Sequence, residues 1–247
     1  MRDLTQRSPS WWLRRARFPL AATFAGKVLG LAYTLTGRHR YDDFRLERVH
    51  GAPILITPSV FNPKSLRTGA FFASQLDARV VPEGGEVLDM GTGSGVCAVF
   101  AARLARRVVA VDINPAAVRC AGLNALLNHR EHLIEVRHGD LFAPLRGESF
   151  DLILFNPPFI RGTPRDDRDR AWRSIDVAER FAAGLDAHLK PGGSALVLLS
   201  SFGDPGFFLD EFHRQHLKVS LFAARRFVNE RLAIFRLEPE ANGDRHD

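Results

Sequence analysis

Cysteine is scarce in this sequence of 247 residues, which contains only Cys97 and Cys120. Two cysteines cannot build a disulfide framework, and this scarcity is typical of proteins that work in a reducing compartment. We therefore expect a cytoplasmic protein. Both cysteines fall in stretches with the composition of helices, so their expected role is to pack in the core.

Clusters of metal-binding side chains are also absent from the sequence. The nine histidines include no H-x-x-x-H pair, and His129, His132 and His138 fall in polar segments that we expect to be exposed. The two cysteines lack the close spacing of metal ligands. The sequence therefore predicts no metal site. It also has no internal repeat, heptad run or low-complexity tract, which favours one sizeable domain.

An excess of positive charge is missing from most of the chain. The formal net charge is +6, but the first 40 residues hold eight of the 34 Lys/Arg and one of the 28 Asp/Glu. The rest of the chain therefore has 26 basic and 27 acidic side chains. Enzymes that act on nucleic acid usually have a broad basic surface. Such a surface would have to lie on the N-terminal segment or on a local patch.

The N-terminal residues 1–45 read as a basic, helical extension. An apolar stretch at residues 18–36 follows several arginines and is interrupted by Lys27. Three interpretations are open: a helix packed on the next domain, an interfacial helix that contacts a membrane surface or a partner, and an organelle transit peptide. Because Lys27 interrupts the one long apolar stretch, we expect no integral membrane span.

Residues 46–247 are expected to form an α/β domain. Short apolar runs alternate with stretches of helical spacing. In the second half of the chain we expect helices at 176–189 and 207–216, and strands at 195–199, 219–223 and 232–237. This alternation predicts a mainly parallel sheet with helices on both faces.

A glycine turn between a strand and a helix is the first sign of a ligand site. The apolar run at residues 86–90 leads into a turn with three glycines, Gly91, Gly93 and Gly95. Residues 96–106 then have helical spacing. Such glycines let the backbone approach a ligand, and the helix N-terminus offers unpaired N–H groups. The order G-x-G-x-G differs from the dinucleotide pattern, and the preceding Asp89 suits a cationic amino group better than a pyrophosphate.

Acidic residues follow the next two predicted strands. The strand at residues 108–111 ends at Asp112, where a carboxylate can accept hydrogen bonds from ribose hydroxyls. The alternative is a helix cap, but we assign the cap to Asn114, which leaves Asp112 free for a ligand. Asp140 follows the strand at residues 134–137. It either binds an adenine amine or is a turn residue.

The tetrapeptide Asn156-Pro157-Pro158-Phe159 follows directly after the apolar strand at residues 151–155. Consecutive prolines restrict the backbone, and Pro157 keeps Asn156 extended. The Asn156 side-chain oxygen and the Pro157 carbonyl oxygen thereby become fixed acceptors beside the ring of Phe159. In open α/β sheets, ligands bind at the carboxyl ends of the strands. The alternative is a proline-stiffened loop with no role in binding.

These four motifs, in this order, resemble those of the class I S-adenosylmethionine-dependent methyltransferases. The resemblance extends over residues 50–240 and is most specific for the HemK-like branch, whose members methylate glutamine side-chain amides or the exocyclic amine of adenine. A fifth element, Val60-Phe61-Asn62-Pro63 with Thr68, is similar to the part of these enzymes that closes over the methionine end of the cofactor. Relatives commonly have acidic residues after this proline, whereas Lys64 and Ser65 stand here.

The resemblance implies a fold, a cofactor and a set of site residues. The fold would be a Rossmann-like, mainly parallel seven-stranded sheet with helices on both faces and an antiparallel last strand. The methyl donor would be S-adenosylmethionine and the product S-adenosylhomocysteine. The implied cofactor-binding residues are Phe61, Pro63, Thr68, Asp89, Gly91, Gly93, Gly95, Asp112, Asp140 and Leu141. The implied catalytic residues are Asn156, Pro157 and Phe159.

The chemistry explains why such residues are needed. An amide or aryl-amine nitrogen is a poor nucleophile because its lone pair is delocalised. Hydrogen bonds from its N–H groups to the oxygens of Asn156 and Pro157 would strengthen as the nitrogen attacks, which stabilises the transition state selectively. Phe159 would lie against the planar substrate, and the face of Phe61 would attract the sulfonium.

The sequence allows three interpretations of the methyl acceptor, each from a different class of function. The leading interpretation is a protein glutamine, the first alternative is adenine in RNA or DNA, and the second is a non-catalytic cofactor-binding scaffold. An arginine-rich segment after the tetrapeptide either borders the substrate pocket or is a solvated, self-paired loop. This segment contains Arg161, Arg165, Arg168, Arg170 and Arg173, mixed with Asp166, Asp167 and Asp169.

Overall fold

The structure is a computed structural model that describes residues 43–63, 67–164, 169–228 and 230–240. Residues 1–42 of the helical extension expected at 1–45 therefore lie outside the described residues, and residue 45 already belongs to a strand. Lys64, Ser65 and part of the arginine-rich segment also lie outside the described residues.

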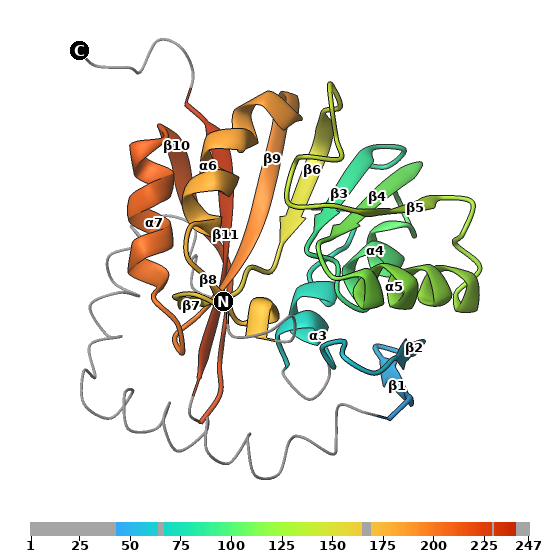
Figure 1. Ribbon diagram of the computed structural model, residues 1–247. Helices are drawn as coiled ribbons and strands as arrows, with labels where there is room; N and C mark the ends of the chain where they lie inside the picture. The colour runs from blue at the N-terminus through green and yellow to red at the C-terminus, as the bar shows by residue number, and fades with distance from the viewer. Residues whose placement is uncertain (1–42, 64–66, 165–168, 229, 241–247) are drawn as a thin grey trace.

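A seven-stranded sheet forms the centre of the molecule (Figure 1). Its spatial order is β10 (Leu217–Arg226), β11 (Arg231–Pro239), β9 (Leu189–Ser200), β6 (Phe150–Phe155), β3 (Glu86–Met90), β4 (Arg107–Asp112) and β5 (Ile134–His138). Strands β5, β4, β3, β6 and β9 pair in parallel, whereas β11 is antiparallel to both β9 and β10. The expected mainly parallel sheet with an antiparallel last strand is confirmed.

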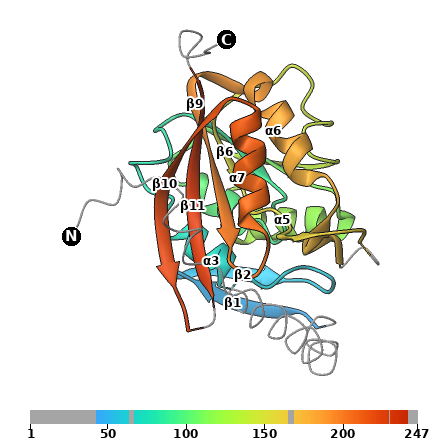
Figure 2. The ribbon, with the colours of Figure 1, turned by 90° about the vertical axis from the view of Figure 1, so that its left-hand side faces the viewer.

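Helices cover both faces of this sheet, which explains why its central strands are apolar throughout rather than alternating. Helices α3 (Thr68–Ala73), α4 (Val96–Ala101) and α5 (Pro115–Leu127) pack on one face, and α6 (Val177–His188) and α7 (Pro205–Arg214) pack on the other. Figure 2 shows α7 on the side of the sheet that faces the viewer, where it packs on β10. Cys97 and Cys120 are both buried and free, as expected.

Several element boundaries differ from the expected ones. α4 ends at Ala101, five residues before the helical spacing ends. α7 begins at Pro205 because the Asp204 side chain accepts a hydrogen bond from the Phe207 N–H and caps the helix. β9 already begins at Leu189, so the segment Lys190-Pro191-Gly192-Gly193, which reads as a turn in the sequence, belongs to the strand.

Two small sheets are not predicted by the sequence. Strands β1 (Arg45–Val49) and β2 (Ala52–Ile56) form a hairpin before α3. Strands β7 (Ile160–Arg161) and β8 (Arg173–Ser174) pair in parallel across the arginine-rich segment, with a short 3₁₀ helix, η3 (Asp169–Ala171), before β8. Both sheets are too short to give a periodic apolar pattern.

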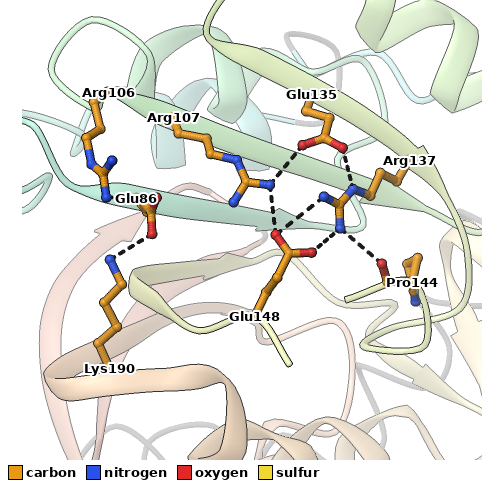
Figure 3. A network of polar contacts seen from close by, with 8 residues as sticks. All are labelled: Glu86, Arg106, Arg107, Glu135, Arg137, Pro144, Glu148 and Lys190. Carbon is orange, nitrogen blue, oxygen red and sulfur yellow. Dashed lines mark hydrogen bonds and ion pairs between the residues drawn. The ribbon is translucent and has the colours of Figure 1, made fainter. Parts of the chain in front are cut away.

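Ion pairs link β4 and β5 to Glu148, just before β6, as the close view in Figure 3 shows. Glu148 accepts from Arg107, at 2.7 Å, and from Arg137, and the same two arginines also contact Glu135. These hydrogen bonds, first from Arg137 and then from Arg107, lower the pKa of Glu135 to about 2. Nearby, Lys190 lies 2.8 Å from Glu86, which holds the start of β9 against the sheet.

Candidate active site

The carboxyl ends of β3, β4 and β6 open into one pocket of about 410 Å³. All the candidate site residues except Gly95 line it: Phe61, Pro63, Thr68, Asp89, Gly91, Gly93, Asp112, Asp140, Leu141, Asn156, Pro157 and Phe159. The fold thus brings together residues from five separate motifs. Parallel strands explain this convergence, because their carboxyl ends share one edge of the sheet.

Gly95 lies outside the lining of this pocket and packs against α5. It stands at the N-terminus of α4 with φ +77°, and a Cβ there would lie 2.9 Å from the Cα of Ala121 on α5. Only glycine tolerates both the left-handed backbone and this close approach. Gly91 and Gly93, with φ of +63° and +57°, form the part of the turn that lines the pocket.

Asp89 is a buried carboxyl at the end of β3, with an exposed fraction of 4%. Its Oδ2 accepts hydrogen bonds from the Thr92 hydroxyl at 2.6 Å and from the Ala98 N–H at 3.0 Å. Burial nevertheless raises its pKa to about 7. A cation bound in the pocket would counter this desolvation and favour the ionised carboxylate.

The Asp112 carboxylate makes more hydrogen bonds within the protein than the sequence predicts. Asn114 does cap α5, since its side-chain oxygen accepts from the Ala116 N–H at 2.9 Å. The Asp112 carboxylate is engaged as well, because its two oxygens accept from the N–H groups of Gly93, at 2.8 Å, and Asn114, at 2.9 Å. Each carboxylate oxygen can accept a further hydrogen bond. Asp112 therefore both fixes the glycine turn and presents acceptors to the pocket.

Asp140 lies at the rim of the pocket and is half-exposed. Its carboxylate accepts from Arg180 on α6 at 2.7 Å, and its carbonyl oxygen accepts from the Ala143 N–H, which closes a turn. The next residue, Leu141, has φ +47°. Asp140 thus serves the turn and an ion pair and also borders the pocket, so a contact to an adenine amine stays a prediction.

Asn156 has a buried side-chain oxygen without a partner among the residues that the structure describes. The side-chain nitrogen of the same amide donates to the Thr68 hydroxyl at 3.5 Å. This contact orients the amide so that its nitrogen faces α3. The free atom is therefore an acceptor, and buried acceptors without partners are rare enough to indicate a ligand site.

Trp172 is a pocket residue that the sequence motifs do not reveal. Its ring meets the ring of Phe61 edge-on, with centroids 4.2 Å apart, and both line the pocket. Since Trp172 is a lone tryptophan in a charged segment, no spacing pattern singles it out. The β7–β8 pairing, which includes a hydrogen bond from the Ile160 N–H to the Trp172 carbonyl at 2.8 Å, brings it to the site.

The arginines beside the pocket are paired with acids. Arg161 lies 3.7 Å from Glu179, and Arg173 lies 3.1 Å from Asp169. Arg173 also lines the pocket, so the segment both pairs with itself and borders the site. Arg165 and Arg168, like Asp166 and Asp167, are outside the described residues, as is the side chain of Arg170.

The described part of the chain contains neither a cluster of metal-binding side chains nor a membrane-crossing helix. No group of three or more His, Cys, Asp or Glu side chains there is placed to hold a metal ion. Among the helices of the described ranges, none is long and apolar enough to cross a membrane.

Comparison with known proteins identifies the family. The family model of the methyltransferase small domain matches residues 52–221. A release factor glutamine methyltransferase of Koribacter versatilis is 32% identical over 197 residues, which cover 67% of this chain and 69% of that protein. A ribosomal RNA small subunit methyltransferase C of Alcanivorax borkumensis is 33% identical over 137 residues, covering 55% of this chain and 39% of the relative.

Solved structures agree with the fold. The 16S rRNA N2 G1207 methyltransferase of T. thermophilus, solved with AdoMet and guanosine, superimposes with a TM-score of 0.59 at 24% identity and covers 80% of this chain and 50% of its own. Together with the family match and the described pocket, the resemblance noted in the sequence is confirmed. The chain belongs to the methyltransferase small domain family, as a class I methyltransferase of the HemK-like branch.

Proposed function

We propose that this enzyme transfers a methyl group from S-adenosylmethionine to the side-chain amide nitrogen of a protein glutamine. The observation that carries the proposal is the buried Asn156 oxygen, which faces no donor within the described residues. At the carboxyl end of β6 and on the pocket wall, it is an acceptor in need of an N–H group.

The pocket suits S-adenosylmethionine through its donor and acceptor chemistry. Asp89 supplies a buried carboxylate for the amino group, and Asp112 supplies acceptor oxygens for the ribose hydroxyls. Gly91 and Gly93 leave the floor of the pocket open to backbone contact. When bound there, the cofactor supplies an electrophilic methyl group on sulfur. The edge-on pair of Phe61 and Trp172 offers aromatic surface to the sulfonium.

The reaction needs little acid–base chemistry from the protein. As the nitrogen–methyl bond forms, the methyl–sulfur bond would break with its electrons staying on sulfur, so the donor would leave as S-adenosylhomocysteine. The cationic nitrogen would then lose one N–H proton to water. Asn156 Oδ1 and the Pro157 carbonyl oxygen accept the two N–H groups of the acceptor amide and hold its lone pair toward the methyl donor. These hydrogen bonds strengthen as the nitrogen loses its planarity and becomes cationic, so they stabilise the transition state more than the bound substrate. Phe159 lies against the amide plane and excludes water.

Charge favours a protein acceptor over a polynucleotide. Arg161 and Arg173, the arginines of the segment after Phe159 that the structure describes with their side chains, are each matched by an acid within 4 Å. Such pairs leave little free positive charge to hold phosphates at this side of the pocket. A relative named for a glutamine acceptor supports the same choice. Adenine in RNA is the second candidate, supported by the relative that is named a ribosomal RNA methyltransferase.

The test is transfer of labelled methyl groups from S-adenosylmethionine to cell extract, with protein and nucleic-acid fractions counted separately. We expect label in protein, released by complete digestion as N5-methylglutamine. Asn156→Ala should abolish most of this transfer. Asn128→Ala is the matched control. It also removes a side-chain amide, but this amide lies outside the pocket and donates to the Pro53 carbonyl. Label confined to nucleic acid would favour the second candidate, and cofactor binding without any transfer would favour the scaffold.

A further inference from the structure

The turn that follows β9, at residues 200–204, packs directly on the backbone of Phe159. A Cβ built on Gly203 would overlap the Phe159 carbonyl oxygen and lie 2.5 Å from the Phe159 Cβ and 2.8 Å from its carbonyl carbon. Cβ atoms in proteins essentially never lie closer than 3.0 Å to a heavy atom of another residue that is not a chain neighbour. The φ of Gly203 is not positive, so its backbone conformation does not require glycine. Glycine is required here only because a Cβ has no room.

Hydrogen bonds hold the same peptide from both sides. The Asp204 N–H donates to the Phe159 carbonyl at 3.2 Å, and the Ile160 N–H donates to the Trp172 carbonyl at 2.8 Å. The first bond comes from the turn after β9 and the second from the segment before β8. The peptide between Phe159 and Ile160 is therefore clamped between two loops that are distant in sequence.

The turn itself is anchored by Ser200, a fully buried residue. Its hydroxyl donates to Glu230 at 2.5 Å and accepts from the Phe202 N–H at 3.1 Å. The adjacent Ser201 exchanges two hydrogen bonds with Arg231, both at 2.9 Å. The start of β11 thus fixes the turn, and the turn fixes Phe159.

We infer that the turn at residues 200–204 is a positioning element for the methyl acceptor, with Gly203 and Ser200 as its positioning residues. The inference rests on the proposed function, in which Phe159 lies against the acceptor amide. Neither Gly203 nor Ser200 lines the pocket, so the cofactor does not touch them. A shift of Phe159 would misalign the amide with the methyl donor and lower kcat, while cofactor affinity stays unchanged.

Two variants perturb the turn by different means. Gly203→Ala adds a methyl group against the Phe159 backbone, and Ser200→Ala removes only a hydroxyl. The matched control for the added methyl group is Gly122→Ala, because a Cβ at Gly122 meets nothing within 4 Å. Glu230→Gln is the conservative control, because its amide oxygen still accepts the hydrogen bond from Ser200.

The experiment combines kinetics with a local probe in the full-length chain. Transfer to the protein fraction gives kcat and the acceptor KM, and calorimetry gives the Kd of S-adenosylmethionine. A fluorinated phenylalanine placed only at position 159 reports the surroundings of that side chain by ¹⁹F NMR. We expect kcat to fall about 10–100-fold in Gly203→Ala and less in Ser200→Ala, with an unchanged Kd and a displaced fluorine resonance. Gly122→Ala and Glu230→Gln should resemble the wild type.

The outcomes separate this inference from the proposed function. If the wild type methylates nothing, the proposed function fails, and the fluorine resonance still decides whether the turn positions Phe159. Unchanged kcat and resonance in Gly203→Ala would overturn the inference. If that variant does not fold, Ser200→Ala decides alone. An equal loss in Glu230→Gln and Ser200→Ala would contradict the anchoring hydrogen bond.

Discussion

Cofactor binding should become roughly 50-fold tighter between pH 5 and pH 7, because in the proposed binding mode Asp89 must ionise to pair with the cofactor amino group. Burial raises the pKa of Asp89 to about 7, while hydrogen bonds from Thr92 and Ala98 act in the opposite direction. With this pKa, about 1% of the carboxyl groups are ionised at pH 5 and about half at pH 7. The amino group stays largely protonated over this range, so the change in affinity follows mainly the ionised fraction of Asp89.

The same pKa has an opposite effect on the free protein. Because the folded-state pKa of Asp89 is raised above its ordinary value of 3.8, the stability that this group contributes is complete below pH 3.8 and is lost as the pH rises through about 7. In the proposed binding mode, the cofactor amino group keeps Asp89 ionised and removes this loss. The increase in melting temperature on addition of S-adenosylmethionine should therefore be larger at pH 7 than at pH 5.

Calorimetric titrations at several pH values measure the effect directly. Asp89→Asn keeps an oxygen for Thr92 and Ala98 but cannot ionise, so its affinity should be weak and independent of pH. Burial also raises the pKa of Asp112, which makes Asp112→Asn the matched control: it should weaken binding yet keep the pH dependence. Equal wild-type affinity at pH 5 and pH 7, or a pH dependence that survives in Asp89→Asn, would refute the reasoning.

Three further predictions concern catalysis and stability. Asn156→Ala should lower kcat about 10²–10³-fold without changing cofactor affinity, since one preorganised acceptor is lost; comparable turnover in the variant and the wild type contradicts this. Gly95→Ala should destabilise the protein by about 1–3 kcal/mol in urea unfolding, because its Cβ meets the Ala121 backbone at 2.9 Å. Glu148→Gln should cost about 1 kcal/mol at pH 7, and the stability from the Glu135–Arg137 network should be lost as the pH falls from 4.5 to about 2. An unfolding midpoint that is insensitive to acid in this range argues against that network.

The local sequence is sufficient to predict the side of the pocket around Asp89, Asp112 and the glycine turn. Motif spacing predicts four features because each lies within a few residues of a glycine turn or a helix start. These are the strand before Gly91, the cap at Asn114, and the carboxyl groups of Asp89 and Asp112. The two hydrogen bonds that the Asp112 carboxylate accepts from the protein were not predictable in this way, for a physical reason. Its bond to the Gly93 N–H spans the ends of two neighbouring strands, and their register is a tertiary property.

The aromatic wall at Trp172 and the position of Phe159 depend on contacts between distant segments, and sequence patterns reveal little of them. Trp172 reaches the pocket through the β7–β8 pairing, and Gly203 matters only because the chain returns to Phe159 after β9. No periodicity marks either residue. Local motifs therefore indicate the methyl donor, whereas the leading choice of a protein glutamine as acceptor depends on the family resemblance as a whole. Variants that test acceptor choice belong in these long-range contacts, where a change can alter substrate alignment and leave the Asp89 side of the pocket intact.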